Sequence, residues 1–151
     1  MKIGLAILLL MGMSLLVRAG IDLEGYTIFT IPTSINKDST PAYFTISVNK
    51  KFAIKIRGNP TTGYQVFLAN DDKVTQSNIV KALNLTHKGT SKDYVTDPHP
   101  EHMVGVPGNY YFTFLAEQVG QVKLKFEHKR AWDTSDSTSL EVTINVVAGD
   151  L

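Results

Sequence analysis

Leu140-Glu141-Val142-Thr143-Ile144-Asn145-Val146 (LEVTINV) alternates apolar and polar side chains over seven residues. Because successive side chains of a β-strand point to opposite faces, this period predicts a strand with one face buried and the other in water. The same alternation recurs at Phe52–Ile56 and at Val122–Phe126. Further segments rich in β-branched and aromatic residues are Tyr26–Ile31, Ala42–Val48, Tyr64–Ala69 and Asn109–Glu117.

Turn-forming residues separate these seven candidate strands. They lie at Asn49-Lys50, Gly58–Gly63, Asn70-Asp71-Asp72, Gly105–Gly108, Val119-Gly120 and Asp133–Ser139. Short strands joined by regular turns predict an all-β fold, an immunoglobulin-like antiparallel β-sandwich of about seven or eight strands. Only Asn78–Leu85 (NIVKALNL) has a pattern that fits one or two helical turns.

The first nineteen residues have the layout of a secretory signal peptide. Lys2 precedes an apolar run from Ile3 to Val17, and Val17-Arg18-Ala19 places compact residues at the positions that specify a cut after Ala19. A membrane anchor is the alternative, but it needs about 20 apolar residues and Arg18 ends this run earlier. We therefore expect residues 1–19 to be removed. Residues 20–151 then form one sandwich domain, secreted or held in an endosomal or lysosomal vesicle, with no stable membrane anchor.

Composition narrows the possible functions. The chain has no cysteine, so the sandwich contains no disulfide, and a thiol nucleophile and a thiolate metal ligand are excluded. Without residues 1–19 it carries 13 Lys and Arg against 14 Asp and Glu, which predicts neither a nucleic-acid partner nor strong attraction to a membrane. Asn84-Leu85-Thr86 is a glycosylation sequence that would be exposed if it is used.

Thr86–Gly108 does not follow the strand rhythm. It is polar and contains three prolines, with one short candidate edge strand at Tyr94-Val95. Loops of this length are usually functional or disordered. His99, Glu101 and His102 could be ligands of a metal-dependent enzyme, but a metal site needs three or four converging ligands, so a solvated loop is the favoured interpretation. We expect no cofactor.

RGNPTTGY, residues 57–64, lies between two candidate strands. Pro60 restricts φ, and Gly63 permits a positive φ that lets the chain enter the next strand. Thr61 and Thr62 are stiff at χ1, so the tip is preorganised, small and uncharged, with hydroxyl donors and free backbone groups. Such a loop loses little entropy on entering a narrow cleft. An ordinary hairpin turn is the alternative.

Two more loops contain residues typical of binding surfaces. Gly105-Val106-Pro107-Gly108 precedes NYYFTF, and Arg130-Ala131-Trp132-Asp133 follows KLKFEHK. The only tryptophan of the chain is therefore in a polar turn near an arginine, and these two residue types are enriched in binding hot spots. The alternative is that Trp132 caps the core, since tryptophan is usually largely buried.

In this order and at this spacing, NPTTGY, the Gly-x-x-Gly loop before YYFTF and the Arg-x-Trp loop resemble the chagasin-type inhibitors of papain-like cysteine peptidases. The resemblance covers the chain from about Tyr26 to Val147. The family pattern has Gly-x-Gly-Gly in the second loop, where this chain has Pro107, and Arg-Pro-Trp in the third, where it has Ala131. Both departures lie at positions that shape the backbone.

The resemblance implies a function. Members of this family are immunoglobulin-like sandwiches in which three loops at one end enter the active-site cleft of the peptidase. This chain is therefore expected not to be an enzyme but a reversible, tight-binding inhibitor of papain-like, cathepsin-like cysteine peptidases. The implied peptidase-binding residues are Asn59, Pro60, Thr61, Thr62, Gly63, Tyr64, Gly105, Val106, Pro107, Gly108, Arg130, Ala131, Trp132 and Asp133. The alternative function is a secreted immunoglobulin-like adhesion or ligand-binding module.

Overall fold

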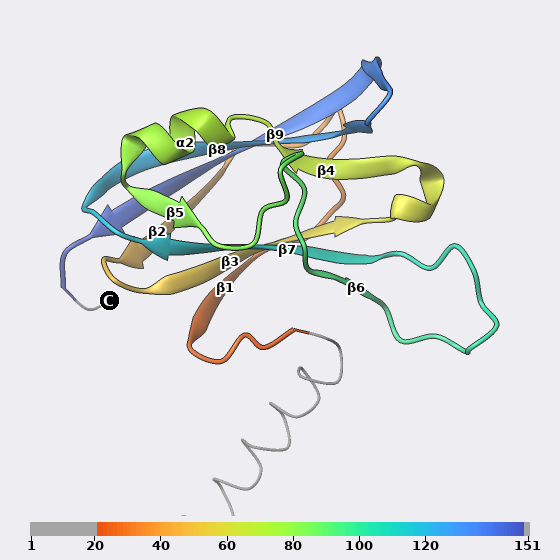
Figure 1. The fold of residues 1–151 in the computed structure, drawn as a ribbon, viewed down its shortest axis with the longest axis horizontal. Helices are drawn as coiled ribbons and strands as arrows, with labels where there is room; N and C mark the ends of the chain where they lie inside the picture. Colours follow the sequence, from red (N-terminus) through yellow and green to blue (C-terminus); the bar gives the residue numbers. More distant parts are fainter. Residues whose placement is uncertain (1–20, 150–151) are drawn as a thin grey trace, which may run out of the picture.

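Alternating burial along the predicted strands builds two sheets that pack face to face (Figure 1). The computed structural model describes residues 21–149, so the predicted signal peptide at residues 1–19 lies outside it. LEVTINV lies within β9 (Asp133–Val147), and the four apolar residues of its alternation are buried. The pattern therefore marks the face of the strand that forms the core, as predicted.

Nine strands form the two sheets within the described residues. One sheet has the order β1 (Tyr26–Ile31), β3 (Lys51–Gly58), β7 (Gly108–Ala116) and β5 (Val80–Ala82), and β6 (Tyr94–Thr96) also pairs with β7. The other sheet has the order β2 (Ala42–Ser47), β9, β8 (Gly120–Arg130) and β4 (Tyr64–Leu68). The predicted all-β, immunoglobulin-like sandwich is confirmed. The count of nine exceeds the predicted seven or eight because it includes β5 and β6, two strands of only three residues each.

The inner strands pair antiparallel, as predicted, whereas the outer strands β1 and β2 pair in parallel with β3 and β9. β1 and β3 lie in one sheet, and β2, between them in sequence, lies in the other. The chain therefore crosses from one sheet to the other and back, which lets β1 and β3 run in the same direction. These two crossings tie the sheets together.

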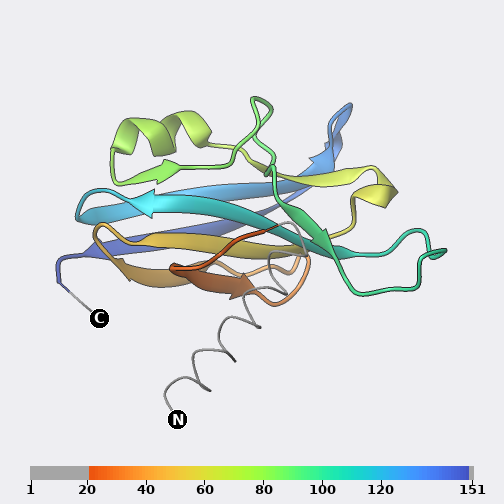
Figure 2. The same cartoon turned by 60° about the horizontal axis from the view of Figure 1, so that its bottom comes forward.

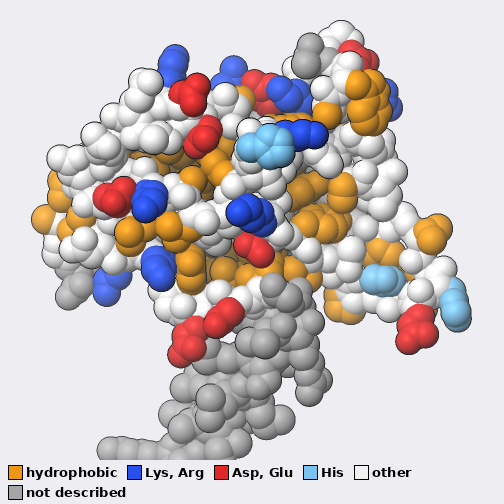
Figure 3. All heavy atoms as spheres, viewed as in Figure 1, with side chains coloured by type: hydrophobic (Ala, Val, Ile, Leu, Met, Phe, Trp, Pro, Cys, Tyr) orange, Lys and Arg blue, Asp and Glu red, His pale blue; other side chains and the backbone are white. Residues whose placement is uncertain are grey.

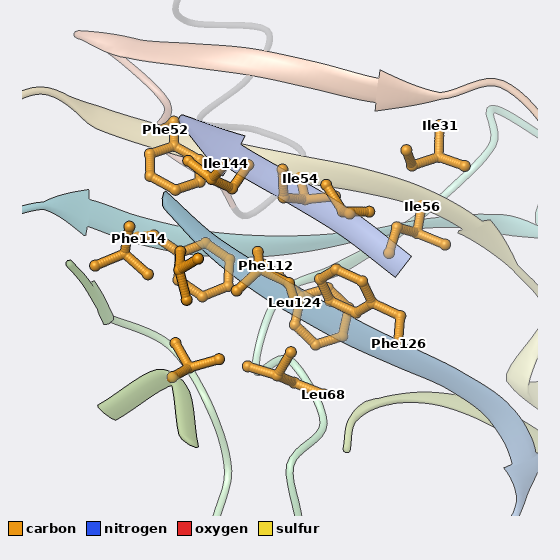
Figure 4. Close-up of a cluster of buried hydrophobic side chains, with 14 of the residues drawn as sticks. Ile31, Phe52, Ile54, Ile56, Leu68, Phe112, Phe114, Leu124, Phe126 and Ile144 are labelled. Atoms are coloured by element: carbon orange, nitrogen blue, oxygen red, sulfur yellow. The ribbon is translucent and has the colours of Figure 1, made fainter. Parts of the chain in front are cut away.

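Aromatic rings fill the centre between the sheets (Figure 4). Phe52 and Phe114 stack with ring centroids 5.2 Å apart, and Phe112 meets Phe126 edge to face at 4.9 Å. All four are completely buried. Burying a side chain of this size stabilises the folded state by about 1.5–3 kcal/mol. Apolar packing therefore holds together a domain that has no cysteine.

The prediction of a helical turn at residues 78–85 is wrong. These residues contain β5, whereas the helix α2 spans Asp71–Ser77, where a turn was expected. Two aspartates in the first turn of α2 interact favourably with the helix dipole, and Asn78 ends the helix with a φ of 58°. β5 exists because it pairs with β7, a contact that the local pattern does not contain. Within residues 21–149, no helix is long and apolar enough to span a membrane.

The prediction of a turn at residues 133–139 is also wrong. β8 and β9 meet at residues 131–132, and Asp133 is already paired with Arg130. The polar residues that suggested a turn form a two-stranded extension beyond the body of the sandwich (Figures 1 and 2). This part of the hairpin has no core to cover, so its sequence lacks the alternation of a half-buried strand.

Candidate functional site

Three loops meet at one end of the sandwich, and α2 lies at the opposite end (Figures 1 and 2). We call residues 59–63, between β3 and β4, the first loop, residues 97–107, between β6 and β7, the second loop, and residues 131–132, between β8 and β9, the third loop. β3 and β8 end at this pole, and β7 and β4 begin there. The topology therefore brings together the three sequence motifs that were predicted to bind a partner.

The first loop is a single turn of 3-10 helix, η1 (Pro60–Thr62). Asn59 precedes it in an extended conformation, and its Oδ1 accepts the backbone N–H of Thr61 at 3.2 Å. Pro60 occupies the first helical position, which suits its fixed φ, and Gly63 ends the turn with a φ of +86°. The predicted roles of Pro60 and Gly63 in a stiff turn are confirmed.

The threonine hydroxyl groups at the tip are used inside the first loop. Thr61 Oγ1 donates to Asn59 Oδ1 at 2.5 Å, and Thr62 Oγ1 donates to the backbone carbonyl of Asn59 at 2.8 Å. The hydroxyl donors predicted from the sequence are therefore both used within the loop, because Asn59 supplies an acceptor for each. Both threonines are exposed. The two threonines therefore offer a partner their methyl groups and the lone pairs of their hydroxyl oxygens.

Asn59 also joins the first loop to the second. Its Nδ2 donates to the backbone carbonyl of Gly105 at 3.0 Å, while its Oδ1 is engaged by Thr61. Gly105 has a φ of +72°, which glycine adopts without the steric cost of a side chain. One amide side chain therefore shapes the first loop and sets its distance from the second.

The third loop reaches the first through Trp132. A Cβ built on Gly63 would lie 3.1 Å from Cη2 of Trp132 and 3.5 Å from Cζ2, so the edge of the indole lies against the backbone of Gly63. Trp132 is nevertheless 75% exposed. The alternative that Trp132 caps the core is therefore wrong. A large apolar ring is held in solvent beside the first loop, as in many binding hot spots.

Tyr64 connects the end of the first loop to the β8–β9 hairpin. Its hydroxyl donates to Asp136 Oδ2 at 2.5 Å, and this bond raises the pKa of the phenol. Its ring stacks on His128 with centroids 5.0 Å apart, and the Arg130 guanidinium carbon lies 4.5 Å from the ring centroid. His128 is half-buried, and this burial lowers the pKa of the imidazole. Tyr64 thus contacts both strands of the hairpin.

The second loop contains both buried and exposed residues. Val106 is buried, and Gly108 lies inside β7, where a Cβ would be only 2.2 Å from the carbonyl oxygen of Val95. These two predicted site residues shape the loop from within the domain, and their contact with a peptidase stays a prediction. Met103 and Val104 are 54% and 91% exposed at the loop end, although neither is part of the motifs. Their signal in the sequence is a pair of apolar residues in an otherwise polar loop.

An ion pair closes the base of the second loop. Arg57 at the end of β3 makes a two-pronged contact with Asp97, with Nη1 2.7 Å from Oδ1 and Nη2 bonded to Oδ2. The hydrogen bonds from Arg57 hold the pKa of Asp97 below its usual value. The backbone N–H of Asp97 also donates to the carbonyl of Pro107 at 2.9 Å. Both ends of the second loop are therefore tied to the sheet.

Two further sequence features lie away from the loop contacts. The two histidines and the glutamate of the second loop are exposed, and Figure 3 shows histidine and acidic side chains at the protruding end of this loop. No group of three potential metal ligands converges within residues 21–149. Asn84, the candidate glycosylation acceptor, is buried. Its Nδ2 donates to Asp93 Oδ2 at 2.7 Å and to the Tyr111 carbonyl at 2.7 Å, and its Oδ1 accepts the N–H of Thr113 at 2.9 Å. The fold uses this side chain internally.

Comparison with known proteins connects this arrangement to a family. The model of the chagasin family peptidase inhibitor I42 matches residues 45–146, more than half of the chain and all three loops. Amoebiasin-1 of Entamoeba histolytica is 25% identical over 114 residues, which cover 75% of this chain and 98% of that protein.

Two solved structures share the fold. The cysteine protease inhibitor EhICP2 from Entamoeba histolytica has a TM-score of 0.51 and 22% identity, over 81% of this chain and 96% of that one. PbICP-C, solved in complex with falcipain-2, has a TM-score of 0.52 and 16% identity, over 80% of this chain and 99% of that one. At these identities the likeness establishes the fold alone. The family model describes inhibitors and not enzymes. With all three loops inside that match, the chain belongs to the chagasin family of peptidase inhibitors.

Proposed function

We propose that this chain is a reversible, tight-binding inhibitor of papain-like cysteine peptidases, cathepsin-like enzymes included. Its binding site comprises residues 59–64, 105–108 and 130–133. The observation that carries the proposal is the continuity of the three loops, since Asn59 bonds the first loop to Gly105 and Gly63 lies against Trp132. Their exposed tips form one preordered edge, and preorganisation lowers the entropic cost of binding.

In this proposal the first loop covers the catalytic cysteine–histidine pair of the peptidase. A peptidase attacks a peptide bond that is held in near-attack geometry. The peptide bonds at this tip form a tight turn instead of an extended strand. The carbonyls of Asn59 and Pro60 accept hydrogen bonds from the N–H groups of Thr62 and Gly63, at 3.2 and 3.0 Å. The tip therefore fills the cleft without presenting a bond that can be cut, and no acyl-enzyme forms.

The second and third loops contact the walls of the cleft. Met103, Val104 and Trp132 are exposed apolar side chains at this end of the domain, and such side chains within a polar surrounding are typical of protein-binding surfaces. Gly105 carries no side chain, so the backbone of the second loop can approach the peptidase closely. We therefore add Met103 and Val104 to the proposed site.

Relatives support the class of target. EhICP2 is described as a cysteine protease inhibitor, and PbICP-C forms a complex with falcipain-2. Membership of the same family argues that this chain acts on the same class of peptidase. The alternative, an adhesion or ligand-binding module, rests only on the sandwich architecture, which many unrelated functions share.

Titration of a fixed amount of papain tests the proposal, with hydrolysis of a fluorogenic peptide as the readout. Activity should fall to zero near one equivalent of inhibitor. Thr62→Glu would place a charge where water is excluded and should weaken binding by about 2 kcal/mol or more. Thr75→Glu, on α2 at the opposite end, is the matched control and should inhibit like the wild type. Full papain activity with several equivalents of folded protein would rule the proposal out.

Reversibility has its own test. Dilution of the inhibited complex should restore papain activity, and the recovered inhibitor should keep its intact mass. A cut between Thr61 and Thr62 would show instead that the loop binds as a slow substrate. These two measurements distinguish a steric plug from a substrate-like inhibitor, whichever peptidase is used.

We also infer that residues 1–19 direct the chain into the secretory pathway, and that it acts outside the cell or in an endosomal or lysosomal vesicle. The positive Lys2, the apolar run and the Val17-Arg18-Ala19 sequence support this inference. N-terminal sequencing of the protein recovered from its native cells should find Gly20 as the first residue. A cytosolic protein that retains Lys2 would contradict it.

A further inference from the structure

We infer that Tyr64 is a positioning residue: it ties the first loop to the β8–β9 hairpin and so sets the place of Trp132 relative to Thr61 and Thr62, without itself contacting the peptidase. The inference rests on the proposed function. It revises the role of one residue of the proposed binding site: the first loop then meets the peptidase through residues 59–63, and Tyr64 supports that loop from within the inhibitor.

The ring and the hydroxyl of Tyr64 interact with both strands of the hairpin. Its ring stacks on His128 with a centroid distance of 5.0 Å and lies 4.5 Å from the Arg130 guanidinium carbon, and both partners are on β8. Its hydroxyl donates to Asp136 on β9 at 2.5 Å. Tyr64 directly follows Gly63, so a side chain anchored here fixes the backbone at the end of the first loop. One side chain therefore holds both strands of the hairpin against that loop.

An irregularity in β9 brings Asp136 to Tyr64. β8 and β9 pair regularly except for a register shift between His128, which pairs with Thr138, and Arg130, which pairs with Asp133. Extra residues in one strand of a pair bend that strand and change the direction of its side chains. The bulge therefore allows Asp136 to accept the Tyr64 hydroxyl.

Trp132 depends on this tie because the β4–β8 ladder ends at the pair Tyr64–Arg130, two residues before it. The ring is 75% exposed and lies against the backbone of Gly63, and the hairpin that carries it extends beyond the core (Figures 1 and 2). An extension without a buried face gains no hydrophobic stabilisation of its own orientation. The Tyr64 contacts supply the orientation instead, through stacking, a cation–π contact and one hydrogen bond.

Fluorescence of the uncomplexed protein tests the inference, because Trp132 is the only tryptophan in the chain. Tyr64→Phe keeps the ring and removes the hydroxyl, and Asp136→Ala removes its acceptor. Both should shift the Trp132 emission and weaken papain inhibition by about fivefold. The double variant should be no worse than either single variant, because both remove the same bond. Asp136→Asn keeps an acceptor oxygen, so it should retain most of the inhibition that Asp136→Ala loses.

Tyr94→Phe is the matched control. It removes a tyrosine hydroxyl that donates to the Gly58 carbonyl at 3.3 Å, away from the hairpin. It should change the Trp132 emission and the inhibition constant little, and comparison of its melting temperature with that of Tyr64→Phe separates a general loss of stability from a loss of position.

Three results would overturn the inference. Unchanged emission with weaker inhibition would mean that the Tyr64 hydroxyl contacts the peptidase directly. Changed emission with unchanged inhibition would mean that the tie exists but does not set the binding geometry. No change in either would mean that the Asp136 bond holds nothing in place. If the wild type fails to inhibit papain, the proposed function fails, while the emission comparison still shows whether Tyr64 orients Trp132.

Discussion

The side-chain amide of Asn59 serves two loops at once, since Nδ2 donates to the Gly105 carbonyl at 3.0 Å while Oδ1 accepts the Thr61 N–H at 3.2 Å. Asn59 and Gly105 are 46 residues apart in the sequence. Both bonds are exposed, so a single polar side chain rather than core packing links these loops. Changes at this end of the molecule should therefore affect inhibition more than stability.

Asn59→Ala should weaken inhibition of papain by about tenfold, because the cap of η1 and the tie to the second loop are lost together. Asn59→Asp keeps the oxygen that caps the turn but has no donor for Gly105, so its inhibition constant should lie between those of the wild type and Asn59→Ala. Inhibition constants and melting temperatures of the three proteins check this. Three equal inhibition constants would contradict it.

Gly63→Ala should displace Trp132 as well as strain the backbone. The φ of +86° costs a side chain about 1–2 kcal/mol, and the new Cβ would lie 3.1 Å from Cη2 of Trp132. Gly25→Ala is the control, because Gly25 has a φ of +79° with nothing within 4 Å of its Cβ. Both variants should melt at a lower temperature, but only Gly63→Ala should change the tryptophan emission and weaken inhibition. Equal inhibition by both would argue against a role for the Gly63–Trp132 contact.

Trp132→Ala should cost about 2 kcal/mol of binding if the ring is a hot spot. Its melting temperature should change little, because the side chain is 75% exposed. Val119→Ala, which also truncates an exposed apolar residue but in the β7–β8 turn at the opposite end, should leave both quantities near wild type. A sharp fall in melting temperature with unchanged inhibition would show that Trp132 serves stability and not binding.

His128 should make stability sensitive to mild acid. Burial lowers the pKa of the folded imidazole, and Asp136 opposes this in part. The unfolded chain then binds the proton more readily, so the contribution of His128 is complete above its ordinary pKa of 6.5 and is lost as the pH falls below it. Tyr64 stacks on the His128 ring, and Arg130 lies on the same strand, β8. Lys37 lines a surface hollow together with His128 and Asp136. As the pH is lowered, the melting temperature of His128→Gln should fall less steeply than that of the wild type.

Two carboxylates with lowered pKa values titrate outside this window. Hydrogen bonds from Arg57 lower the pKa of Asp97, and hydrogen bonds from Ser135 lower that of Asp133. Their contributions are therefore present above the ordinary value of 3.8 and are lost only as the pH falls below it. A series of melting curves between about pH 8 and pH 5 thus reports on His128 separately from these two groups. Identical pH profiles for the wild type and His128→Gln would exclude the imidazole as the source.

Folded, inhibitory protein made in a eukaryotic secretory cell should carry no glycan on Asn84. The amide is buried and bonded to Asp93, Tyr111 and Thr113, so a glycan cannot be attached without breaking these bonds. The mass before and after treatment with an N-glycosidase checks this. An active, glycosylated fraction would show that the protein folds without the Asn84 network.

Asn84→Ala should lower the free energy of unfolding by about 2–3 kcal/mol, because it leaves buried groups without partners. Asn145→Ala, which removes a bond of 2.7 Å to Gln121 on the outer face of the sheet, should cost less than about 1 kcal/mol. Equal losses in the two variants would mean that burial of the Asn84 amide adds nothing to its contribution.

The strands could be predicted because every second residue of a half-buried strand is apolar. Tyr26–Ile31 was predicted with the boundaries that β1 has, and the alternation at residues 140–146 identified the buried face of β9. The wrong predictions lie where this alternation is missing. Residues 80–82 form a strand because β7 lies beside them, and residues 133–139 pair with β8 without a core beneath them. In both cases the partner strand, not the local pattern, decides the conformation.

The amino-acid sequence by itself determined the sandwich and the stiff turn at residues 59–63, because period-two burial and the backbone preferences of proline and glycine are local properties. The resemblance of three short motifs to a known family identified the three loops. Only the tertiary structure decided how the loops fit together. The bond from Asn59 to Gly105, the contact of Trp132 with Gly63 and the clasp of Tyr64 by the hairpin each join residues that are distant in the chain. Such contacts depend on which strand ends meet at one pole, and that is a property of the folded topology alone.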